Sequence, residues 1–254
     1  MKRIVAIVQA RMTSTRLPQK VLKDLAGEPV VFQVFNQLSY SKLIDDIVLA
    51  TSTNISDDPL EEWAKDNNKK YFRGDLSNVL KRFYDTAKEF NADVIVRITA
   101  DCPLIDPEIV DEVIEGFLKS DFDYFSNTNP PTFPDGLDTE VFSFTSLESS
   151  YRNAELQSEI EHVTPYIRNH PELFKSGNFL SVVNYGNLRW TIDNQEDYLF
   201  LVNIFDSLYR SNSFIGWRKV IEFLENNEDL QNINSHIKRN EGFIKTLNED
   251  KKIQ

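Results

Sequence analysis

The chain has 254 residues, of which 41% are hydrophobic, and this length is enough to bury a full core in one large domain. Its formal net charge of −12 at pH 7 argues against a protein that coats nucleic acid, because that function needs a basic surface. An anionic ligand must therefore be bound by a local cluster of cations.

The cellular compartment is indicated by cysteine content and by the N-terminal segment. The single cysteine, Cys102, excludes an internal disulfide and is typical of a reducing compartment, so we expect a cytoplasmic protein. The first apolar run is short and is followed by Arg11 and Arg16, which favours a strand over a signal peptide. No apolar stretch reaches the roughly 20 residues of a membrane-spanning helix. We therefore expect neither a membrane nor a nucleic acid as a partner.

Apolar, β-branched runs alternate with amphipathic helical patterns along the first half of the chain. In chain order the predicted elements are a strand over residues 3–9, a helix over 29–40, a strand over 46–52, a helix capped by Ser56, a strand over 70–73, a helix over 78–90, a strand over 94–99 and a helix over 106–118. The strand 94–99 does not alternate strictly, which favours a parallel sheet covered on both faces. The pattern predicts a Rossmann-like α/β fold with a mostly parallel sheet flanked by helices.

The second half begins with an irregular loop at residues 127–138, where three prolines and a glycine break the pattern. We expect this loop to open a smaller insertion over about residues 128–187 within a main domain over residues 1–226. The elements predicted after it are a strand over 139–144, a helical region over 158–169, strands near 179–185 and 188–192, and helices to about 226. From residue 227 the chain is polar and weakly periodic, which predicts a C-terminal tail over residues 227–254.

A cluster of cations follows the first predicted strand. Arg11, Arg16 and Lys20 lie in one loop, with hydroxyl groups at residues 13–15 between them. Such a loop at the carboxyl edge of an α/β sheet suits a triphosphate, which carries about four negative charges. Any one of these cations alone is as well explained by a solvated surface position, but the cluster favours phosphate binding. The loop has no glycine, so it is neither a Walker loop nor a dinucleotide fingerprint.

Carboxylates for a metal are predicted at the same edge. Asp101 comes directly after the strand 94–99, and Mg²⁺ usually takes one or two carboxylates together with phosphates and water. Asp106 precedes a proline and a helix, so helix capping explains it better. Asp193, taken alone, is also better explained as a helix cap. Cys102 is expected to be a packed residue.

Residues 10–20 form the motif AR-x-x-S-x-R-L-P-x-K, which resembles the opening of the CMP-Kdo synthetase and acylneuraminate cytidylyltransferase family. The branch named for spore-coat polysaccharide biosynthesis is more similar still. The blocks that carry this resemblance run in order over about residues 3–200: VQARMTSTRLPQKVL, YFRGDLSNVLKRF, VRITADCPLIDP, GLDTEVF, EHVTPYIR and RWTIDNQEDY.

The resemblance implies a GT-A-like nucleotidyltransferase fold and the transfer of CMP from CTP to a sugar acid or related small acceptor, with release of pyrophosphate, for cell-surface polysaccharide synthesis. It implies Mg²⁺ held by Asp101 and Asp193, and a homodimer formed through the insertion. Arg11, Lys20 and Asp101 are then the catalytic residues. The nucleotide-binding residues that it implies are Ala10, Arg11, Ser14, Arg16, Lys20, Thr51, Ser52 and Asp101.

Polar residues of the insertion are candidates for binding the acceptor, namely Asp138, Glu140, His162 and Arg168. An arginine such as Arg168 can hold a carboxylate or phosphate through two hydrogen bonds. His162 can orient or deprotonate a hydroxyl group near neutral pH. A lone histidine is more often structural, so both interpretations of His162 stay open.

Two other functions remain possible from the sequence. One is a glycosyltransferase that uses a nucleotide sugar. The three cations of the loop oppose it, and so does the sequence Asp101-Cys-Pro, which is not an Asp-x-Asp motif. The other is a nucleotide-binding protein without catalytic activity. The presence of Arg11, Lys20, Asp101 and Asp193 together argues against that loss of activity.

Overall fold

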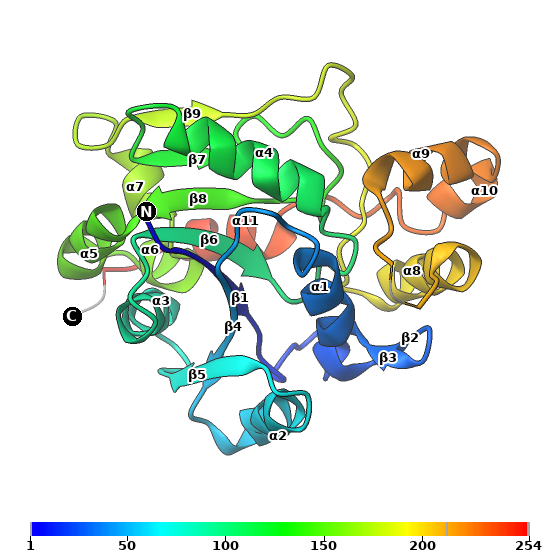
Figure 1. The fold of residues 1–254 in the computed structure, drawn as a ribbon, viewed down its shortest axis with the longest axis horizontal. Coiled ribbons are helices and arrows are strands. Elements are labelled where there is room, and N and C mark those ends of the chain that lie inside the picture. The colour runs from blue at the N-terminus through cyan, green and yellow to red at the C-terminus, as the bar shows by residue number, and fades with distance from the viewer. Residues whose placement is uncertain (1, 212, 253–254) are drawn as a thin grey trace.

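The centre of the molecule is a seven-stranded sheet with the strand order β5-β4-β1-β6-β8-β7-β9 (Figure 1). The computed structural model describes residues 2–211 and 213–252. The strands are β1 (Ile4–Gln9), β4 (Asp46–Ser52), β5 (Lys70–Gly74), β6 (Val94–Thr99), β7 (Tyr124–Ser126), β8 (Glu140–Ser143) and β9 (Ser176–Asn178), and a separate hairpin pairs β2 (Asp24–Leu25) with β3 (Glu28–Pro29). Among the described strands of the large sheet, β8 alone runs antiparallel to its neighbours. The predicted mostly parallel α/β sheet is confirmed.

Helices cover both faces of this sheet (Figure 1). They are α1 (Val30–Leu38), α2 (Asp58–Asp66), α3 (Val79–Glu89), α4 (Pro107–Leu118), α5 (Phe144–Asn153), α6 (Gln157–His162), α7 (Pro165–Asn169), α8 (Gln195–Leu208), α9 (Trp217–Glu225), α10 (Glu228–Gln231) and α11 (Glu241–Asn248), with short 3₁₀ turns η1 (Lys20–Leu22) and η2 (Ile55–Asp57). Ile4, Ala6 and Val8 of β1 belong to a core with α1, α2, α4, α8 and α9. Val5 and Ile7 belong to a second core with α3, α5 and α7, so this apolar strand is buried on both faces.

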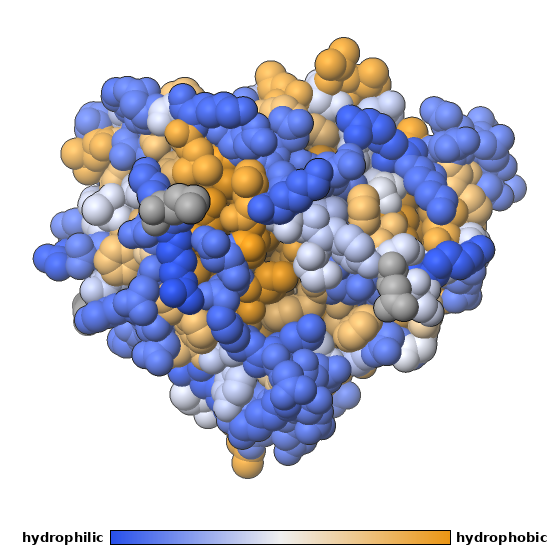
Figure 2. Space-filling view, in the orientation of Figure 1, coloured by the Kyte–Doolittle hydropathy of each residue, from blue (hydrophilic) through white to orange (hydrophobic). Residues whose placement is uncertain are grey.

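Two predictions of local structure are wrong. Ser56 does not cap a helix: the side chain of Asn54 accepts a hydrogen bond from the Ser56 amide, and α2 begins only after the turn η2. The segments 179–185 and 188–192 were predicted as strands but do not form them. β9 ends before the first segment, and in the second Arg189 makes only an isolated bridge. The first apolar run is exposed, with Val182 fully accessible, and Figure 2 shows hydrophobic side chains on the loop after β9 at the top of the view. Phe179 and Tyr185, at the ends of this run, pack against the core, but the apolar residues between them stay exposed, so the run does not form a buried strand.

The C-terminal segment folds back onto the main body. Asn234 is buried, and its side-chain amide donates to the carbonyl of Arg189 at 3.0 Å. The helix α11 packs against α6, and Asp250 accepts a hydrogen bond from the Ser158 hydroxyl at 2.6 Å. The division into a main domain, an insertion and a tail stays a prediction, but residues 227–252 contain the helices α10 and α11 and contact the rest of the chain. None of the helices in the described part of the chain combines the length and apolar composition that crossing a membrane requires.

The expected capping role of Asp106 is confirmed. One oxygen of its buried carboxylate accepts from the amides of Glu108 and Ile109 at 2.9 and 3.2 Å, at the start of α4. The other oxygen accepts from the amide of Trp217 at 2.8 Å, at the start of α9. Asp106 therefore joins two helix N-termini and is not free to bind a metal.

We predict that Asp106→Ala lowers the free energy of unfolding by roughly 2–4 kcal/mol, because three amides lose their acceptor and two of them are buried. Denaturant unfolding measures this loss. The matched control is Glu108→Ala, which removes an exposed carboxylate from the same helical turn and should cost less than about 1 kcal/mol. Equal losses in the two variants would contradict the capping role.

Candidate active site

Three charged side chains from distant segments meet at the carboxyl edge of the sheet. Lys20 follows Gln19, whose left-handed backbone (φ 58°) turns the chain into η1 and directs the lysine inward. Its ammonium group donates to Asp101 at 2.5 Å, to Asp193 at 2.7 Å and to the carbonyl of Ile192 at 2.7 Å. The sequence prediction that Lys20, Asp101 and Asp193 belong to one site therefore agrees with the geometry.

Burial and charge act in opposite directions on this cluster. Burial alone would lower the pKa of Lys20, but Asp101 and Asp193 outweigh it and the pKa is raised. Burial likewise favours neutral Asp101, but the neighbouring ammonium of Lys20 lowers the pKa of this carboxyl below its ordinary value. Lys20 and Asp101 are therefore both charged at neutral pH.

Asp193 is not a helix cap, contrary to the simplest interpretation of its sequence position. The N-cap of α8 is Asn194, and Asp197 accepts hydrogen bonds from the amides of both Asp193 and Asn194. The Asp193 carboxylate is thereby left to pair with cations, and besides Lys20 it contacts Arg16 at 3.0 Å and Arg189 at 3.3 Å.

The donor set fits a magnesium ion that is shared with a substrate. Asp101 and Asp193 supply hard carboxylate oxygens that converge on one cation, the Lys20 ammonium. Among the described residues, no group of three or more histidine, cysteine or acidic side chains is arranged to hold a metal. Two carboxylates with a shell completed by phosphates and water are typical of Mg²⁺ sites.

The loop cations border a cavity of about 310 Å³, which we call the loop cavity. Its lining includes Arg11, Arg16 and Lys20 together with Arg82 of α3. Arg11 has a half-exposed side chain, and the acidic group recorded nearest to it, Glu161, lies 4.0 Å away. These cations are therefore concentrated on one side of an acidic protein.

Of the other residues that were predicted to bind the nucleotide, two line the loop cavity and two do not. Ala10 and Ser14 line the loop cavity, and the Ser14 hydroxyl also accepts from the Leu17 amide at 3.4 Å. Thr51 and Ser52 are fully buried and do not line it. The Ser52 hydroxyl donates to Asp57 at 2.5 Å. Contact of Thr51 and Ser52 with a nucleotide stays a prediction.

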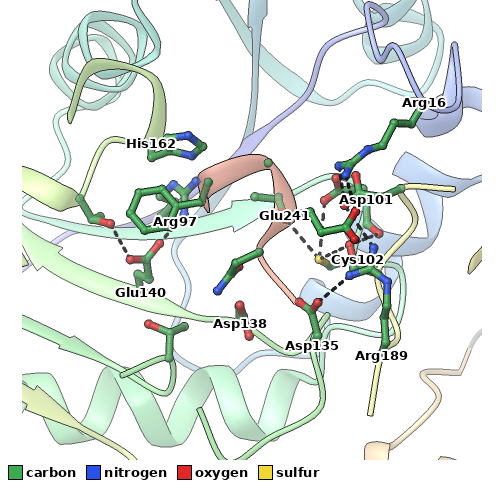
Figure 3. Close-up of a pocket in the computed structure, with 18 of the residues that line it drawn as sticks. Arg16, Arg97, Asp101, Cys102, Asp135, Asp138, Glu140, His162, Arg189 and Glu241 are labelled. Carbon is green, nitrogen blue, oxygen red and sulfur yellow. Dashed lines mark hydrogen bonds and ion pairs between the residues drawn. The ribbon is translucent and has the colours of Figure 1, made fainter. Parts of the chain in front are cut away.

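A second cavity of about 230 Å³, the sheet cavity, adjoins the first. The two share Arg16, Thr99, Asp101, His162 and Asp193 in their linings. Figure 3 shows His162, Arg97 and Glu140 at one end of the sheet cavity and Arg16, Asp101 and Arg189 at the other. The site therefore has two halves that meet at Asp101 and Asp193.

Glu140 organises the far end of the sheet cavity. It lies opposite Arg97 in the pairing of β8 with β6, and the two side chains form an ion pair. Its carboxylate also accepts from Tyr124 at 2.6 Å and from Thr164 at 2.7 Å. Burial would raise the pKa of Glu140, but Arg97 and Arg168 together with these hydrogen bonds lower it. Glu140 is thus an ionised group whose oxygens are occupied by protein donors.

Two arginines of the sheet cavity retain unused donors. The Nε atoms of Arg97 and Arg168 are buried and have no hydrogen-bond partner within the described residues. No carboxylate among them lies within ion-pair distance of Arg168. A buried donor without a partner costs about 1–3 kcal/mol, which an anionic ligand would recover. The cavity is suited to a small molecule that carries a carboxylate or phosphate.

The carboxylate of Asp138 is paired with another residue of the protein. It forms an ion pair with Arg239 of the C-terminal segment, although burial raises its pKa. The neighbouring Asp135 pairs with Arg189 at 3.0 Å, and burial followed by the charge of Asp138 raises the pKa of Asp135 to about 7. Contact of Asp138 with an acceptor stays a prediction.

Cys102 is buried, and its thiol lies 3.1 Å from the Thr99 hydroxyl. Burial, followed by the charge of Asp101, raises the pKa of this thiol well above its ordinary value. A thiol that stays protonated is a poor nucleophile. The prediction of a packed residue is confirmed.

Several residues of the site were not anticipated from the sequence. Arg97 had one usable signal, since it is the charged residue in an otherwise apolar strand. The residues of the C-terminal segment carried no signal in their polar, weakly periodic sequence. They are Arg239, which binds Asp138, and Asn240, Glu241, Gly242 and Phe243, which line the sheet cavity.

His162 ends α6 and lies between the two cavities. Its Nε2 is 3.1 Å from the Thr246 hydroxyl, and its ring packs edge-on against Phe243. Val163 follows with φ 71°, a strained backbone for a β-branched residue. Burial, then the charges of Arg97 and Arg168, lower the pKa of His162 to about 4, so the ring is neutral at pH 7.

We predict that His162 lowers the stability of the protein in mild acid. The folded pKa of about 4 lies below the ordinary value near 6.5, so below pH 6.5 the unfolded chain binds a proton that the folded protein does not. The contribution of neutral His162 to the free energy of unfolding is therefore fully present above pH 6.5 and is lost as the pH falls toward 4. Between pH 7 and pH 5 the free energy of unfolding should fall by about 2 kcal/mol more in the wild type than in His162→Asn. Denaturant unfolding at the two pH values measures this difference, and equal losses would contradict it.

The comparisons with known proteins give the family. Residues 5–245 match the family model described as cytidylyltransferase. The chain is 38% identical over 243 residues to the uncharacterized protein MJ1063 of Methanocaldococcus jannaschii, covering 93% of this chain and 96% of that protein. It is 37% identical over 206 residues to the spore coat polysaccharide biosynthesis protein SpsF of Bacillus subtilis, covering 78% of this chain and 84% of that protein.

A solved structure of a cytidylyltransferase from Leptospira borgpetersenii is similar in fold and sequence. It has a TM-score of 0.86 and 33% sequence identity, and the match covers 91% of this chain and 97% of that one. Together with the family model, these relatives confirm the resemblance that the motifs indicated. The chain belongs to the cytidylyltransferase family.

Proposed function

We propose that this cytidylyltransferase transfers CMP from CTP to a sugar acid or a related small anionic acceptor and releases pyrophosphate. The observation that carries the proposal is the position of Asp101 and Asp193, which border both the loop cavity and the sheet cavity and bind Lys20 between them. Two substrates that fill adjoining cavities meet at this point, and the reaction needs that proximity.

The loop cavity would take CTP. Arg11, Arg16 and Lys20 offer three cations to a triphosphate with about four negative charges, and charge-assisted hydrogen bonds are the stronger class. Ser14 and Ala10 lie beside them in the same lining. Because the rest of the protein is acidic, this local cluster would supply the attraction that binding needs.

Asp101 and Asp193 would hold Mg²⁺ together with phosphate oxygens and water. When bound, this ion would polarise the α-phosphorus and neutralise negative charge on the departing pyrophosphate. Lys20, already in contact with both carboxylates, and Arg16 would contribute further positive charge on the side of the leaving group.

The acceptor would bind in the sheet cavity through an anionic group at Arg168 and Arg97, whose buried Nε donors have no protein partner among the described residues. A hydroxyl oxygen of the acceptor would attack the α-phosphorus directly, and its proton would pass to water. The new phosphorus–oxygen bond then forms as the bond to pyrophosphate breaks. Cys102 takes no part in this scheme because its thiol is buried and protonated. Neutral His162, at the boundary of the two cavities, would orient the acceptor.

The wider setting of the reaction is also part of the proposal. The similarity to the spore coat polysaccharide biosynthesis protein supports a role in cell-surface polysaccharide synthesis. The single cysteine supports a cytoplasmic location, where CTP is available. A homodimer would form through the insertion over residues 128–187.

We predict pyrophosphate release only when CTP, Mg²⁺ and one class of anionic acceptor are present together. The assay tests each of the four nucleoside triphosphates against a panel of sugar acids and sugar phosphates. Preference for another nucleotide would contradict the proposal. Absence of release with every pair despite tight CTP binding would also contradict it, and would favour a nucleotide-binding protein without activity.

We predict that Asp101→Asn lowers kcat by roughly 100-fold or more, because it removes charge from the point where the two cavities meet. The control is Asp121→Asn, which changes an exposed carboxylate far from the site. Steady-state pyrophosphate release measures the effect, and thermal unfolding verifies that both variants are folded. Wild-type turnover in Asp101→Asn would exclude the proposed metal ligand.

A further inference from the structure

The helix α11 borders both halves of the site. Residues 240–243, at its start, line the sheet cavity, and Arg16 of the loop contacts Glu241. Figure 1 shows α11 in red behind β6, and the helix packs against α6, which ends at His162. A segment that the sequence predicted as a tail therefore lies where both substrates would enter.

Glu241 forms an ion pair with Arg16, one of the three cations in the loop after β1. Arg16 contacts Asp193 through one terminal nitrogen at 3.0 Å and Glu241 through the other at 3.2 Å. Both terminal nitrogens are therefore paired with carboxylates. A triphosphate that binds Arg16 would therefore compete with these carboxylates for its positive charge.

Phe243, two residues after Glu241, packs over the guanidinium of Arg168 in the sheet cavity. Its ring centroid lies 5.3 Å from the guanidinium of Arg168 and 4.9 Å from the centroid of the His162 ring. One short helix thus contacts Arg16 in the nucleotide half and Arg168 in the acceptor half. Any movement of α11 changes access to both.

The helix has polar contacts at both ends and at Thr246, which lies beside His162, but it buries little apolar surface. None of its residues is buried, and the apolar side chains Ile244 and Leu247 are 48% and 43% exposed. Arg239 pairs with Asp138 before the helix, and Asp250 accepts from Ser158 after it. An element with little buried apolar surface opens at low cost in free energy.

We propose that Glu241 competes with the triphosphate of CTP for Arg16, and that loss of the Glu241 contact frees α11 and uncovers Arg168 for the acceptor. The proposal rests on the proposed binding of triphosphate by Arg16. A triphosphate repels the Glu241 carboxylate and offers Arg16 stronger charge-assisted hydrogen bonds. Binding of CTP in one cavity thereby opens the other, and the coupling is reciprocal.

Isothermal titration of CTP in the presence of Mg²⁺ tests the competition. Glu241→Gln should bind CTP about two- to fivefold more tightly than the wild type, the range expected for removal of one exposed ion pair. The matched control is Glu249→Gln, which makes the same charge change at the other, exposed end of α11 and should leave the affinity unchanged. Unchanged or weaker binding by Glu241→Gln would overturn the proposal.

A double-mutant cycle with Arg16→Ala separates this proposal from the function on which it rests. In the Arg16→Ala background, Glu241→Gln should no longer tighten CTP binding. If Arg16→Ala binds CTP as the wild type does, the triphosphate role of Arg16 fails, and this inference fails with it. If Arg16→Ala weakens binding while Glu241→Gln in the wild type has no effect, only the role of Glu241 fails.

Hydrogen exchange tests the movement of the helix. Amides of residues 242–248 should exchange faster in the CTP-bound protein than in the free protein. The control region is β6, whose exchange should not rise. Slower or unchanged exchange in residues 242–248 on CTP binding would exclude the opening of α11.

Discussion

The ammonium group of Lys20 lies in the protein interior between the carboxylates of Asp101 and Asp193. An unpaired buried charge would cost several kcal/mol, so this arrangement persists only if all three groups are held together. Lys20 comes from the loop after β1, Asp101 from the end of β6 and Asp193 from the residues before α8. The positions of the loop after β1, the sheet edge and α8 are therefore mutually dependent, because these ion pairs join them.

This pairing extends outward from Asp193 through a second buried cation. Arg189 contacts Asp193 at 3.3 Å and Asp135 at 3.0 Å, and Asp197 holds the same guanidinium from the first turn of α8. Asp197 is fully buried and also caps the start of the helix through the amides of Asp193 and Asn194. The two carboxylates that line both cavities are thus oriented before any substrate binds, which is the condition for effective electrostatic catalysis.

The sequence was informative where one local rule decided the structure. The bounds of β4 and β6 could be predicted because both strands are mainly apolar and are buried on both faces. The capping role of Asp106 could be predicted because an aspartate directly before a helix that begins with proline is a good N-cap. The sequence was not informative where contacts between distant residues determined the structure. Leu180, Val182 and Val183 after β9 stay exposed although they are apolar, and Glu241 acquires its significance from an ion pair with a residue 225 positions away. No pattern within a short window reports such a contact.

The sheet cavity depends on the pairing of β8 with β6. β8 lies antiparallel beside β6 in the register that sets Glu140 opposite Arg97, and this joins β8 to the parallel strands of the sheet. The cations of the nucleotide half come instead from the loop after β1. Because the two cavities arise from different segments and share only a few lining residues, the proposed function implies that substitutions around Arg97 and Glu140 would alter acceptor selectivity while Arg11 and Lys20 keep their surroundings.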